Sequence, residues 1–494
     1  MKRWMLMFAM SVLVTGLVFS AGQTEAAAGS AAPPTITIFT GSPGDMPAKE
    51  NDVILKELQD ALDIEIDRTT VSSDYEQQLN IRIAGGNTPD LFTVGGRNQL
   101  VNVVDQDVAL ALDDQVKMMP NIVKWYTETD FDKGRVAGTI YALPKRPYAR
   151  YSTFLIRQDW LEELNLDMPS TLEEFAAVAE AFTTGDPDGN GKNDTFGLTG
   201  YSGVSSFRPI FGAFGTTYDG NWMVRDGEVV YSTVDPRYKE AIAWIRDMVA
   251  SGVVDPELMA NKSQADLNKS FNGQVGINYR NLWEYYKPEY EKRIKDVNPN
   301  ADWAQMPAIS GPYGKADREW DVAVTPSYNV LSADLEDKPS ELDAVLRLLD
   351  YITDGVGQRL VLYGLEGVHH NFDGNAITVD PEKIKEVTYA HNWQFTGRNE
   401  LLYLSTKYAW SLGYLEFVQA QPVISVYNGL VGLPEDVNFA DKDRYEDEEI
   451  AKFIYGIRSM DEWDDFVKVL YDTFDLQLYI DQAESDLAAG GYVK

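Results

Sequence analysis

The first hundred residues alternate between short apolar runs and helical patterns with one apolar face. β-Branched and aromatic residues predict strands, and apolar residues spaced three or four apart predict helices. In chain order, strand, helix, strand, helix and strand are predicted at residues 35–40, 53–62, 63–70, 75–84 and 89–94. This βαβ order is typical of a parallel sheet, in which ligands bind beyond the carboxyl ends of the strands. We therefore expect the glycine-rich turns at 41–44 and 95–97 to border a binding site.

A second strand–helix unit begins after residue 150. Its first strand is expected at 154–156. Two overlapping capping boxes predict the start of a helix: Ser170 with Glu173, and Thr171 with Glu174. Because 494 residues are too many for one hydrophobic core, we expect at least two lobes.

Composition excludes several classes of function. The chain has 77 Asp and Glu against 43 Lys and Arg, a formal net charge of -34. Nucleic acids and anionic lipid surfaces attract clustered positive charge, so we expect neither as a partner. Cysteine is absent, which removes thiol nucleophiles and cysteine zinc sites. The three histidines leave little material for a Ser-His-Asp triad.

The N-terminus has the order of a secretory signal peptide. Lys2 and Arg3 precede an apolar run at 4–19, and small residues follow. The run is shorter than the roughly 20 residues that cross a bilayer. We therefore predict a signal peptide at 1–28, with an uncleaved anchor helix as the alternative. The mature protein is expected in the periplasm or outside the cell.

Residues 186–194 match the first half of an EF-hand-type calcium loop. Side-chain oxygens stand at alternate positions, and Gly191 is at the sixth. The twelfth position is Gly197, where such loops carry a bidentate glutamate, so calcium would recruit another carboxylate or water. The alternative is a turn that uses Asp, Asn and Gly only for their backbone preferences. The expected ligands of a structural calcium ion are Asp186, Asp188, Asn190, the carbonyl of Lys192, and Asp194.

Aromatic residues are numerous, with 11 Trp and 27 Tyr. Sugar rings pack their apolar faces on indole and phenol rings, while polar neighbours bind the hydroxyls. A short apolar strand within 274–283 runs out at Trp283, which makes this ring the first candidate for a cleft wall, with a place in the core as the alternative. Arginines could pair with a uronate carboxylate or bind hydroxyls. The other candidate ligand-binding residues are Tyr279, Arg280, Asn281, Arg97, Arg146, Trp320, Trp393 and Trp410.

Eight short segments form a recognisable series over nearly the whole chain. They lie at residues 35–40, 84–90, 138–144, 156–161, 169–175, 186–194, 363–369 and 457–463. Together they resemble the extracellular solute-binding proteins of carbohydrate ABC importers, family 1 type. The nearest branch by this resemblance contains the alginate-binding and aldouronate-binding proteins.

The resemblance implies an α/β fold of the two-lobed type II periplasmic binding protein class. Each lobe would be a mainly parallel sheet flanked by helices, with a hinge between them. We place one lobe at 33–148 plus about 322–400, and the other at 149–321 plus about 401–494. Members of the family commonly use a tryptophan at the place of Trp283 as a sugar platform. The alginate-binding relatives hold calcium in a loop similar to 186–194.

The resemblance also predicts the function. An oligosaccharide, neutral or uronic, would bind in the inter-lobe cleft and pass to a membrane permease, with no catalytic residue involved. Many relatives carry a lipidated cysteine after the signal peptide, and this chain has none, so we expect a freely soluble monomer. The alternatives are a secreted carbohydrate-active enzyme with a carboxylate pair, and the same fold binding a peptide or other polar solute.

Overall fold

The computed structural model describes residues 32–41, 46–201, 203–262, 264–434, 437 and 439–493. The signal peptide predicted at 1–28 lies outside these residues, as does the turn at 41–44 beyond Gly41. Within the described part, no helix combines the length and the apolar character that a membrane span requires.

A five-stranded sheet forms the centre of the first lobe. Its strands are β1 (Thr35–Gly41), β2 (Glu65–Val71), β3 (Leu91–Val94), β6 (Ala142–Pro144) and β14 (Tyr328–Leu331). The strand order is β2-β1-β3-β14-β6. β1 pairs in parallel with β2 and β3, whereas β14 is antiparallel to β3 and β6. The three predicted strands are confirmed, each beginning within two residues of its predicted start.

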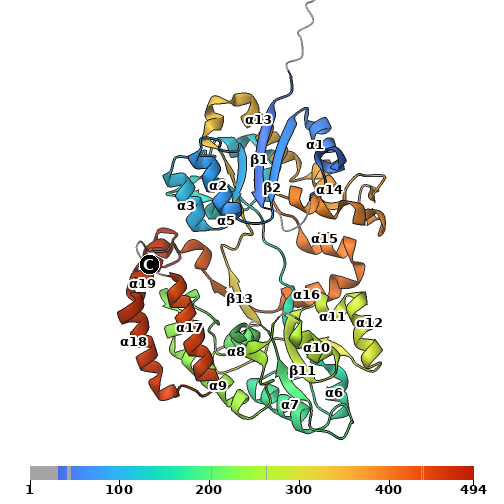
Figure 1. Cartoon of the computed structure of the whole chain (residues 1–494), viewed down its shortest axis with the longest axis vertical. Coiled ribbons are helices and arrows are strands. Elements are labelled where there is room, and N and C mark those ends of the chain that lie inside the picture. The colour runs from blue at the N-terminus through green and yellow to red at the C-terminus, as the bar shows by residue number, and fades with distance from the viewer. Residues whose placement is uncertain are drawn as a thin grey trace, which may run out of the picture. The chain divides into compact units, whose positions relative to one another are not determined.

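Helices from two distant parts of the chain cover this sheet. The helices of the first lobe are α1 (Val53–Leu62), α2 (Tyr75–Ala84), α3 (Arg97–Asp105), α4 (Pro120–Trp125), α5 (Glu128–Lys133), α13 (Pro339–Tyr351) and α14 (Gly355–Tyr363). Two small ladders accompany them: β4 (Arg135–Val136) with β5 (Thr139–Ile140), and β15 (His370–Phe372) with β16 (Ile377–Val379). The blue α1 contacts both α13 and α14, from the gold and orange part of the chain (Figure 1). Their apolar faces share one core with Ile36 and Leu91 of the sheet.

The second lobe contains a four-stranded sheet with the order β12-β7-β11-β8. Its strands are β7 (Ser152–Arg157), β8 (Phe196–Thr199), β11 (Val275–Asn281) and β12 (Trp303–Gln305). β7 is antiparallel to β11 and to β12, and only β11 and β8 are parallel. Both sheets are therefore mixed rather than mainly parallel. The antiparallel members β7 and β14 are strands that the chain enters after crossing from the other lobe, so they run opposite to their neighbours.

The helices of the second lobe are α6 (Gln158–Glu163), α7 (Leu172–Thr184), α8 (Arg208–Ala213), α9 (Pro236–Ala250), α10 (Ala265–Phe271), α11 (Trp283–Tyr286), α12 (Pro288–Val297), α17 (Phe439–Ile454), α18 (Trp463–Phe474) and α19 (Leu476–Ala489). Most of them pack around a core that includes Phe154, Phe175 and Ile245, whereas α10, α11 and α12 pack around a separate cluster with Leu155. Two ladders join the helices: β9 (Trp222–Arg225) with β10 (Glu228–Tyr231), and β13 (Arg318–Asp321) with β17 (Val423–Val426). The red α17 packs against the green α9 (Figure 1).

Three stretches of chain connect the two lobes. Residues 145–151 lead from β6 to β7, and residues 322–327 lead from β13 to β14. The third stretch contains α15 (Glu400–Lys407) and α16 (Leu412–Ala420). Apolar side chains of α15 and α16 share a cluster with Leu282 after β11 and with Tyr363 in α14. These helices thus contact both lobes, and the lobe bounds expected from the sequence stay a prediction.

The start of α7 follows a variant of the predicted capping pattern. Thr171 accepts the backbone N–H of Glu174 at 3.2 Å, as its capping box requires. The Glu174 carboxylate, not that of Glu173, accepts from the backbone N–H and the hydroxyl of Ser170 at 2.8 and 2.7 Å. Thr171 is therefore the N-cap, and Glu174 reaches back to the residue before it; the predicted pairing of Ser170 with Glu173 is not formed.

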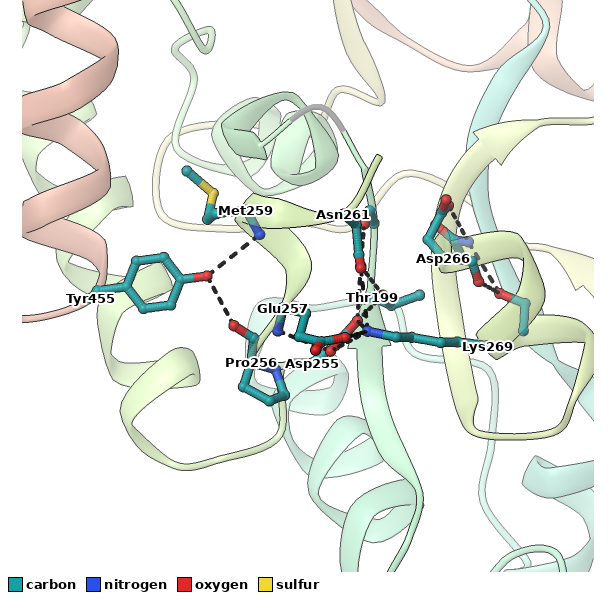
Figure 2. Close-up of polar contacts among 12 residues, drawn as sticks. Thr199, Asp255, Pro256, Glu257, Met259, Asn261, Asp266, Lys269 and Tyr455 are labelled. Atoms are coloured by element: carbon teal, nitrogen blue, oxygen red, sulfur yellow. Dashed lines mark hydrogen bonds and ion pairs between the residues drawn. The ribbon is translucent and has the colours of Figure 1, made fainter. Parts of the chain in front are cut away.

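A buried carboxylate holds the loop before α10 against β8. Asp255 accepts hydrogen bonds from the Lys269 ammonium at 2.7 and 2.9 Å, from Thr199 at 2.7 Å and from Asn261 at 2.9 Å (Figure 2). Burial pushes the pKa of Asp255 upward, but these hydrogen bonds outweigh it and leave the pKa below its usual value. Lys269 therefore ties α10 to the sheet edge.

Candidate functional site

A pocket of about 320 Å³ lies where β1 and β3 end at the edge of the first sheet. Gly41 and Gly95, the first residues of the two predicted turns, line it, and their place at a binding site stays a prediction. This is the edge at which open α/β sheets bind ligands. The lining residues include no Asp or Glu, and their side chains supply polar groups from Thr40, Tyr75, Thr93, Asn329, His391 and Asn392.

Hydrogen bonds fix two of these polar residues. The Tyr75 hydroxyl donates to the carbonyl of Thr93 at 2.7 Å and accepts the Thr93 backbone N–H at 3.1 Å. The Asn329 amide donates to the carbonyls of Leu143 and Phe395 at 2.8 and 2.9 Å. Its buried oxygen Oδ1 has no hydrogen-bond partner in the described part of the chain. The Asn329 side chain is fully buried, so these hydrogen bonds hold the wall of the pocket rigid and present no acceptor to a ligand.

Positive charge gathers beside the pocket. Lys145 lines it, and the guanidinium of Arg68 donates to the Thr40 hydroxyl and the Asn392 carbonyl at its wall, at 3.0 and 2.9 Å. Burial, and secondarily the charge of Arg398, lower the pKa of Lys145 to about 8. Burial lowers the pKa of Arg68 to about 10. Both shifts indicate cations whose surroundings compensate their charge incompletely.

An aromatic cluster lies around Trp283 at the start of α11. The Trp283 ring meets Trp410 edge-on at 5.0 Å and Tyr408 at 5.4 Å between centroids. Tyr151, in the crossing stretch before β7, lies 6.3 Å from the same ring. Asn281 accepts the backbone N–H of Trp283 at 3.1 Å and so fixes the turn out of β11. The structure brings together three predicted residues, Trp283, Trp410 and Asn281.

A charged pair lies between this aromatic cluster and the pocket. Arg398 forms a bidentate pair with Glu400 at 2.5 and 2.8 Å, and Glu400 also accepts from the Tyr151 hydroxyl at 2.6 Å. The Arg398 guanidinium lies 5.3 Å from the centre of the Tyr148 ring, which lines the pocket. Tyr148 is 40% exposed, so one phenol ring is open to a ligand here.

A second set of aromatic and arginine side chains lies in the second lobe. Trp320 on β13 lies 6.0 Å from the Arg150 guanidinium, and Tyr279 lies 5.9 Å from that of Arg208. Tyr279 is buried, and its hydroxyl is without a hydrogen-bond partner among the described residues. The predicted Trp320 is partly exposed, whereas Tyr279 contributes no free ring face.

Other predicted residues serve packing and internal ion pairs. Trp393 is fully buried in the first-lobe core, and Arg280 is buried in a bidentate pair with Asp266 at 2.7 Å. Arg146 stacks on Trp125 and pairs with Asp130, and Arg97 donates to the Arg135 carbonyl. The prediction that they face a ligand is corrected for Trp393 and Arg280, because burial leaves no surface to touch one. Neither Arg97 nor Arg146 lines the pocket.

Several site residues escaped sequence reasoning. Lys145 lies in the stretch 145–150, and nothing in the sequence marks it as a pocket residue. Tyr75 is the first residue of α2, and Asn329 lies in the short strand β14, so neither stands out in the sequence as a pocket residue. Only the pairing of β14 with β3 brings Asn329 to the same edge as Thr93.

The loop at 186–194 is closed by Asn190. Its side-chain amide donates to Asp188 at 2.7 Å and to Asp194 at 3.1 Å, and its backbone N–H donates to Asp186 at 3.0 Å. Burial, followed by the negative charges of Asp194 and Asp186, raises the pKa of Asp188. Gly191, at the sixth position, has a φ of 75°. Among the described residues, no three acidic, histidine or cysteine side chains are arranged to hold a metal.

Two relatives show the chain's similarity in sequence. It is 27% identical over 301 residues to the fructooligosaccharide ABC transporter substrate-binding protein FusA of Streptococcus pneumoniae, covering 57% of this chain and 54% of that protein. It is 27% identical over 340 residues to the polygalacturonan/rhamnogalacturonan-binding protein YtcQ of Bacillus subtilis, covering 65% and 64%. The match thus spans less than two thirds of either relative.

Solved structures show the fold. FusA in complex with kestose has a TM-score of 0.68 at 21% identity, covering 92% of this chain and 100% of that one. An HMO-binding solute-binding protein of Bifidobacterium longum infantis has a TM-score of 0.71 at 20% identity, covering 91% and 98%. The alginate-binding protein AlgQ2, solved without calcium, has a TM-score of 0.65 at 15% identity, covering 92% and 98%. The fold is that of the two-lobed type II periplasmic binding proteins.

A family model also matches the chain directly. The model of the bacterial extracellular solute-binding protein matches residues 40–338. That range begins at the end of β1 and includes both the pocket residue Lys145 and the aromatic residue Trp283. The chain belongs to the family of bacterial extracellular solute-binding proteins.

Proposed function

We propose that this protein is the substrate-binding component of an ABC importer and captures an oligosaccharide outside the cytoplasmic membrane. The observation that carries the proposal is the arrangement of the site. A polar pocket at the carboxyl edge of the first sheet is followed, through Tyr148 and Tyr151, by the aromatic cluster around Trp283. Rings for sugar faces and polar groups for hydroxyls are what an oligosaccharide requires.

Binding would work by a shift between open and closed arrangements of the lobes. A ligand that touches both lobes gains contacts only in the closed form, and this difference in affinity drives closure. The stretches 145–151 and 322–327 are short and run from one lobe to the other, so they are the proposed hinge. The closed form would then deliver the sugar to a membrane permease, with the protein acting as a soluble monomer.

The proposal is of a binding protein and not of an enzyme. Glycoside hydrolysis uses a pair of carboxylates beside the sugar, and no Asp or Glu is among the residues that line the pocket. The closest acid, Glu400, is engaged by Arg398 and Tyr151. Incubation with an oligosaccharide that binds should therefore return the oligosaccharide intact.

Trp283→Ala is expected to weaken oligosaccharide binding about tenfold or more, because it removes a large ring from the wall of the site. Titration calorimetry against a panel of neutral and acidic oligosaccharides measures the change. Trp244→Ala is the matched control, since it removes the same side chain from α9, where Trp244 packs on Phe175. Equal affinities for the Trp283 variant and the unchanged protein would contradict the proposed site.

We further propose that the loop at 186–194 holds a structural calcium ion. What supports this is the donor set: oxygens of Asp188 and Asp194 accept from the Asn190 side-chain amide, and an oxygen of Asp186 accepts from the Asn190 backbone N–H. An N–H donor between carboxylates occupies the kind of place that a cation favours, and Asn190 would turn its oxygen inward on binding. A relative, FusA, has been solved as an EF-hand mutant.

Calcium is expected to raise the melting temperature by a few degrees, and a chelator to reverse the rise, because the ion binds only the folded loop. Asp188→Asn should abolish the calcium response while leaving oligosaccharide affinity unchanged. Asp226→Asn, at an exposed turn in the same lobe, should keep the full response. A calcium response that survives Asp188→Asn would place the ion elsewhere.

A further inference from the structure

The backbone of Lys145 is held firmly at the mouth of the first-lobe pocket. Its N–H donates to the Ser327 carbonyl at 2.8 Å, and its carbonyl accepts from the Thr325 hydroxyl at 2.7 Å. Both crossing stretches, 145–151 and 322–327, are joined by these bonds. The position of Lys145 in the pocket is therefore set by the hinge.

The side chain of Lys145 is a cation without a counter-ion. Its Nζ lies 5.7 Å from the centre of the Tyr148 ring and forms no hydrogen bond or ion pair with any residue that the structure describes. An ammonium group that is partly removed from water and unpaired is costly. A ligand with a negative group would lower that cost.

Arg68 adds a second such cation directly behind the wall of the pocket. Its Nη2 is bound to the Thr40 hydroxyl and the Asn392 carbonyl, but Nε and Nη1 are buried and lack acceptors within the described ranges. The nearest acid in charge terms is Asp52, which is itself occupied in capping α1. The pocket thus borders two cations that its surroundings do not neutralise.

This charge contrasts with the rest of the molecule. Acidic residues outnumber basic ones by 77 to 43 in the whole chain. In the pocket the ratio is reversed: Lys145 is in the lining, Arg68 is behind it, and no Asp or Glu lines it. Glu400 is the acid whose charge acts on Lys145, and Arg398 and the Tyr151 hydroxyl already satisfy it. A concentration of uncompensated positive charge in an acidic protein indicates selection for an anion.

We propose that the ligand is an acidic oligosaccharide, and that its anionic group binds in this pocket against the ammonium of Lys145. The inference rests on the proposed oligosaccharide-binding function and names the class of sugar. Charge-assisted hydrogen bonds from Lys145 would orient the anionic sugar unit. The partly exposed polar side chains of the lining, Thr93, Ser327 and His391, would bind its hydroxyls, while the aromatic cluster around Trp283 would take further units of the chain.

Two kinds of sugar carry a suitable oxyanion. The carboxylate of a uronate and a sulfate ester share the same charge-assisted chemistry toward an ammonium group. A panel of tetragalacturonate, its methyl ester and a sulfated tetrasaccharide distinguishes these sources. The methyl ester has the same rings and linkages as tetragalacturonate, so any difference between the two reports on the charge alone.

Lys145→Met is expected to raise the Kd for tetragalacturonate at least about tenfold at pH 7 and to change the Kd for the methyl ester less than about twofold. Lys117→Met is the matched control, since its side chain is 73% exposed on the surface of the same lobe. It makes the same change in net charge and should leave both Kd values unchanged. The Lys145 variant should melt no lower than the unchanged protein, because it removes an unpaired cation.

Proton uptake gives a second readout that a purely structural lysine would not produce. With a pKa of about 8, Lys145 is mostly neutral at pH 8.5, and an anion beside it favours the charged form. Binding at pH 8.5 should therefore take up roughly 0.5–0.7 proton, and binding at pH 7 close to none. Calorimetry in buffers of different ionisation enthalpy measures this uptake, and Lys145→Met should abolish it.

Other titratable groups around Lys145 do not account for a proton taken up at pH 8.5. Burial lowers the pKa of His391 below its usual value, whereas that of Arg68 is about 10 and burial raises that of Tyr148. The pKa of Arg398 is raised even though burial opposes it, because Glu400 pairs with it. The groups that face Lys145 are thus Arg68 on β2, Tyr148 in the crossing stretch, His391, and Arg398 with Glu400 before α15.

The outcomes separate this inference from the proposed function. Tight binding of tetragalacturonate or of the sulfated sugar, lost in Lys145→Met, supports the inference and identifies the oxyanion. Equal binding of tetragalacturonate and its methyl ester, or of a neutral oligosaccharide alone, overturns the inference and leaves the proposed function standing. Binding of none of the sugars in the panel overturns both.

Discussion

Replacing Trp393 with alanine is expected to lower the free energy of unfolding by about 3–5 kcal/mol. Trp393 is fully buried, meets Phe395 edge-on, and lies beneath the Arg68 guanidinium at 4.3 Å. Alanine would leave a large cavity in the first-lobe core and would remove the ring on which that buried cation rests. Chemical unfolding followed by circular dichroism measures the loss.

The half-buried Trp410 provides the comparison. Trp410→Ala removes a ring of the same size from the cluster around Trp283, and we expect it to cost less than half as much stability. If Trp393→Ala unfolded like the unchanged protein but bound oligosaccharide poorly, Trp393 would be a ligand platform, as the sequence suggested, and its burial would not be its role.

Asp317→Asn is expected to stabilise the protein more at high pH than at low pH. Asp317 is buried; its Oδ1 accepts from the Thr153 hydroxyl at 2.8 Å, and its Oδ2 has no partner in the part of the chain that is described. Burial raises its pKa to about 7, although Arg318 and Arg150 oppose the rise. Folding therefore raises the affinity of this group for a proton.

The sign of the pH dependence follows from linkage. Between a pKa near 3.8 for the unfolded chain and about 7 for the folded one, only the folded state holds the proton, so stability falls as pH rises through this range. Asparagine cannot titrate and does not lose stability in this way. The difference in unfolding free energy between Asp317→Asn and the unchanged protein should grow by about 2 kcal/mol from pH 5.5 to pH 8.5.

Urea unfolding at the two pH values tests this directly. The matched control is Asp472→Asn on the exposed side of α18, which should change the free energy of unfolding by less than about 0.5 kcal/mol at either pH. A constant difference between Asp317→Asn and the unchanged protein would show that Asp317 does not titrate in this interval.

The local patterns of the first lobe were sufficient to predict its first three strands and two helices. Residues 53–62 and 75–84 form α1 and α2 over the predicted ranges. The sequence could not show that β14, a four-residue strand far along the chain, pairs with β3, because this pairing arises only in the tertiary structure. For the same reason the sequence suggested mainly parallel sheets where both are mixed.

One residue of the candidate site could be singled out from the sequence because it directly follows a strand, and its contact with a ligand stays a prediction. Trp283 comes just after β11 and lies in the aromatic cluster, and Trp410 joins it there. The burial of Trp393 could not be predicted, because the segment around it shows no regular spacing of apolar residues from which a buried face could be inferred. Lys145 presents the opposite case, since what makes it notable is the absence of a partner in three dimensions.

The position of β14 between β3 and β6 has a consequence for biosynthesis. When β1, β2 and β3 leave the ribosome, the edge of β3 that pairs with β14 is unfilled until residues 95–327 have also been made. At about 5–20 residues per second this interval is on the order of 10–50 s. An open apolar edge of that kind is prone to aggregation, so the first lobe should fold reliably only where the chain is kept from self-association until β14 is available.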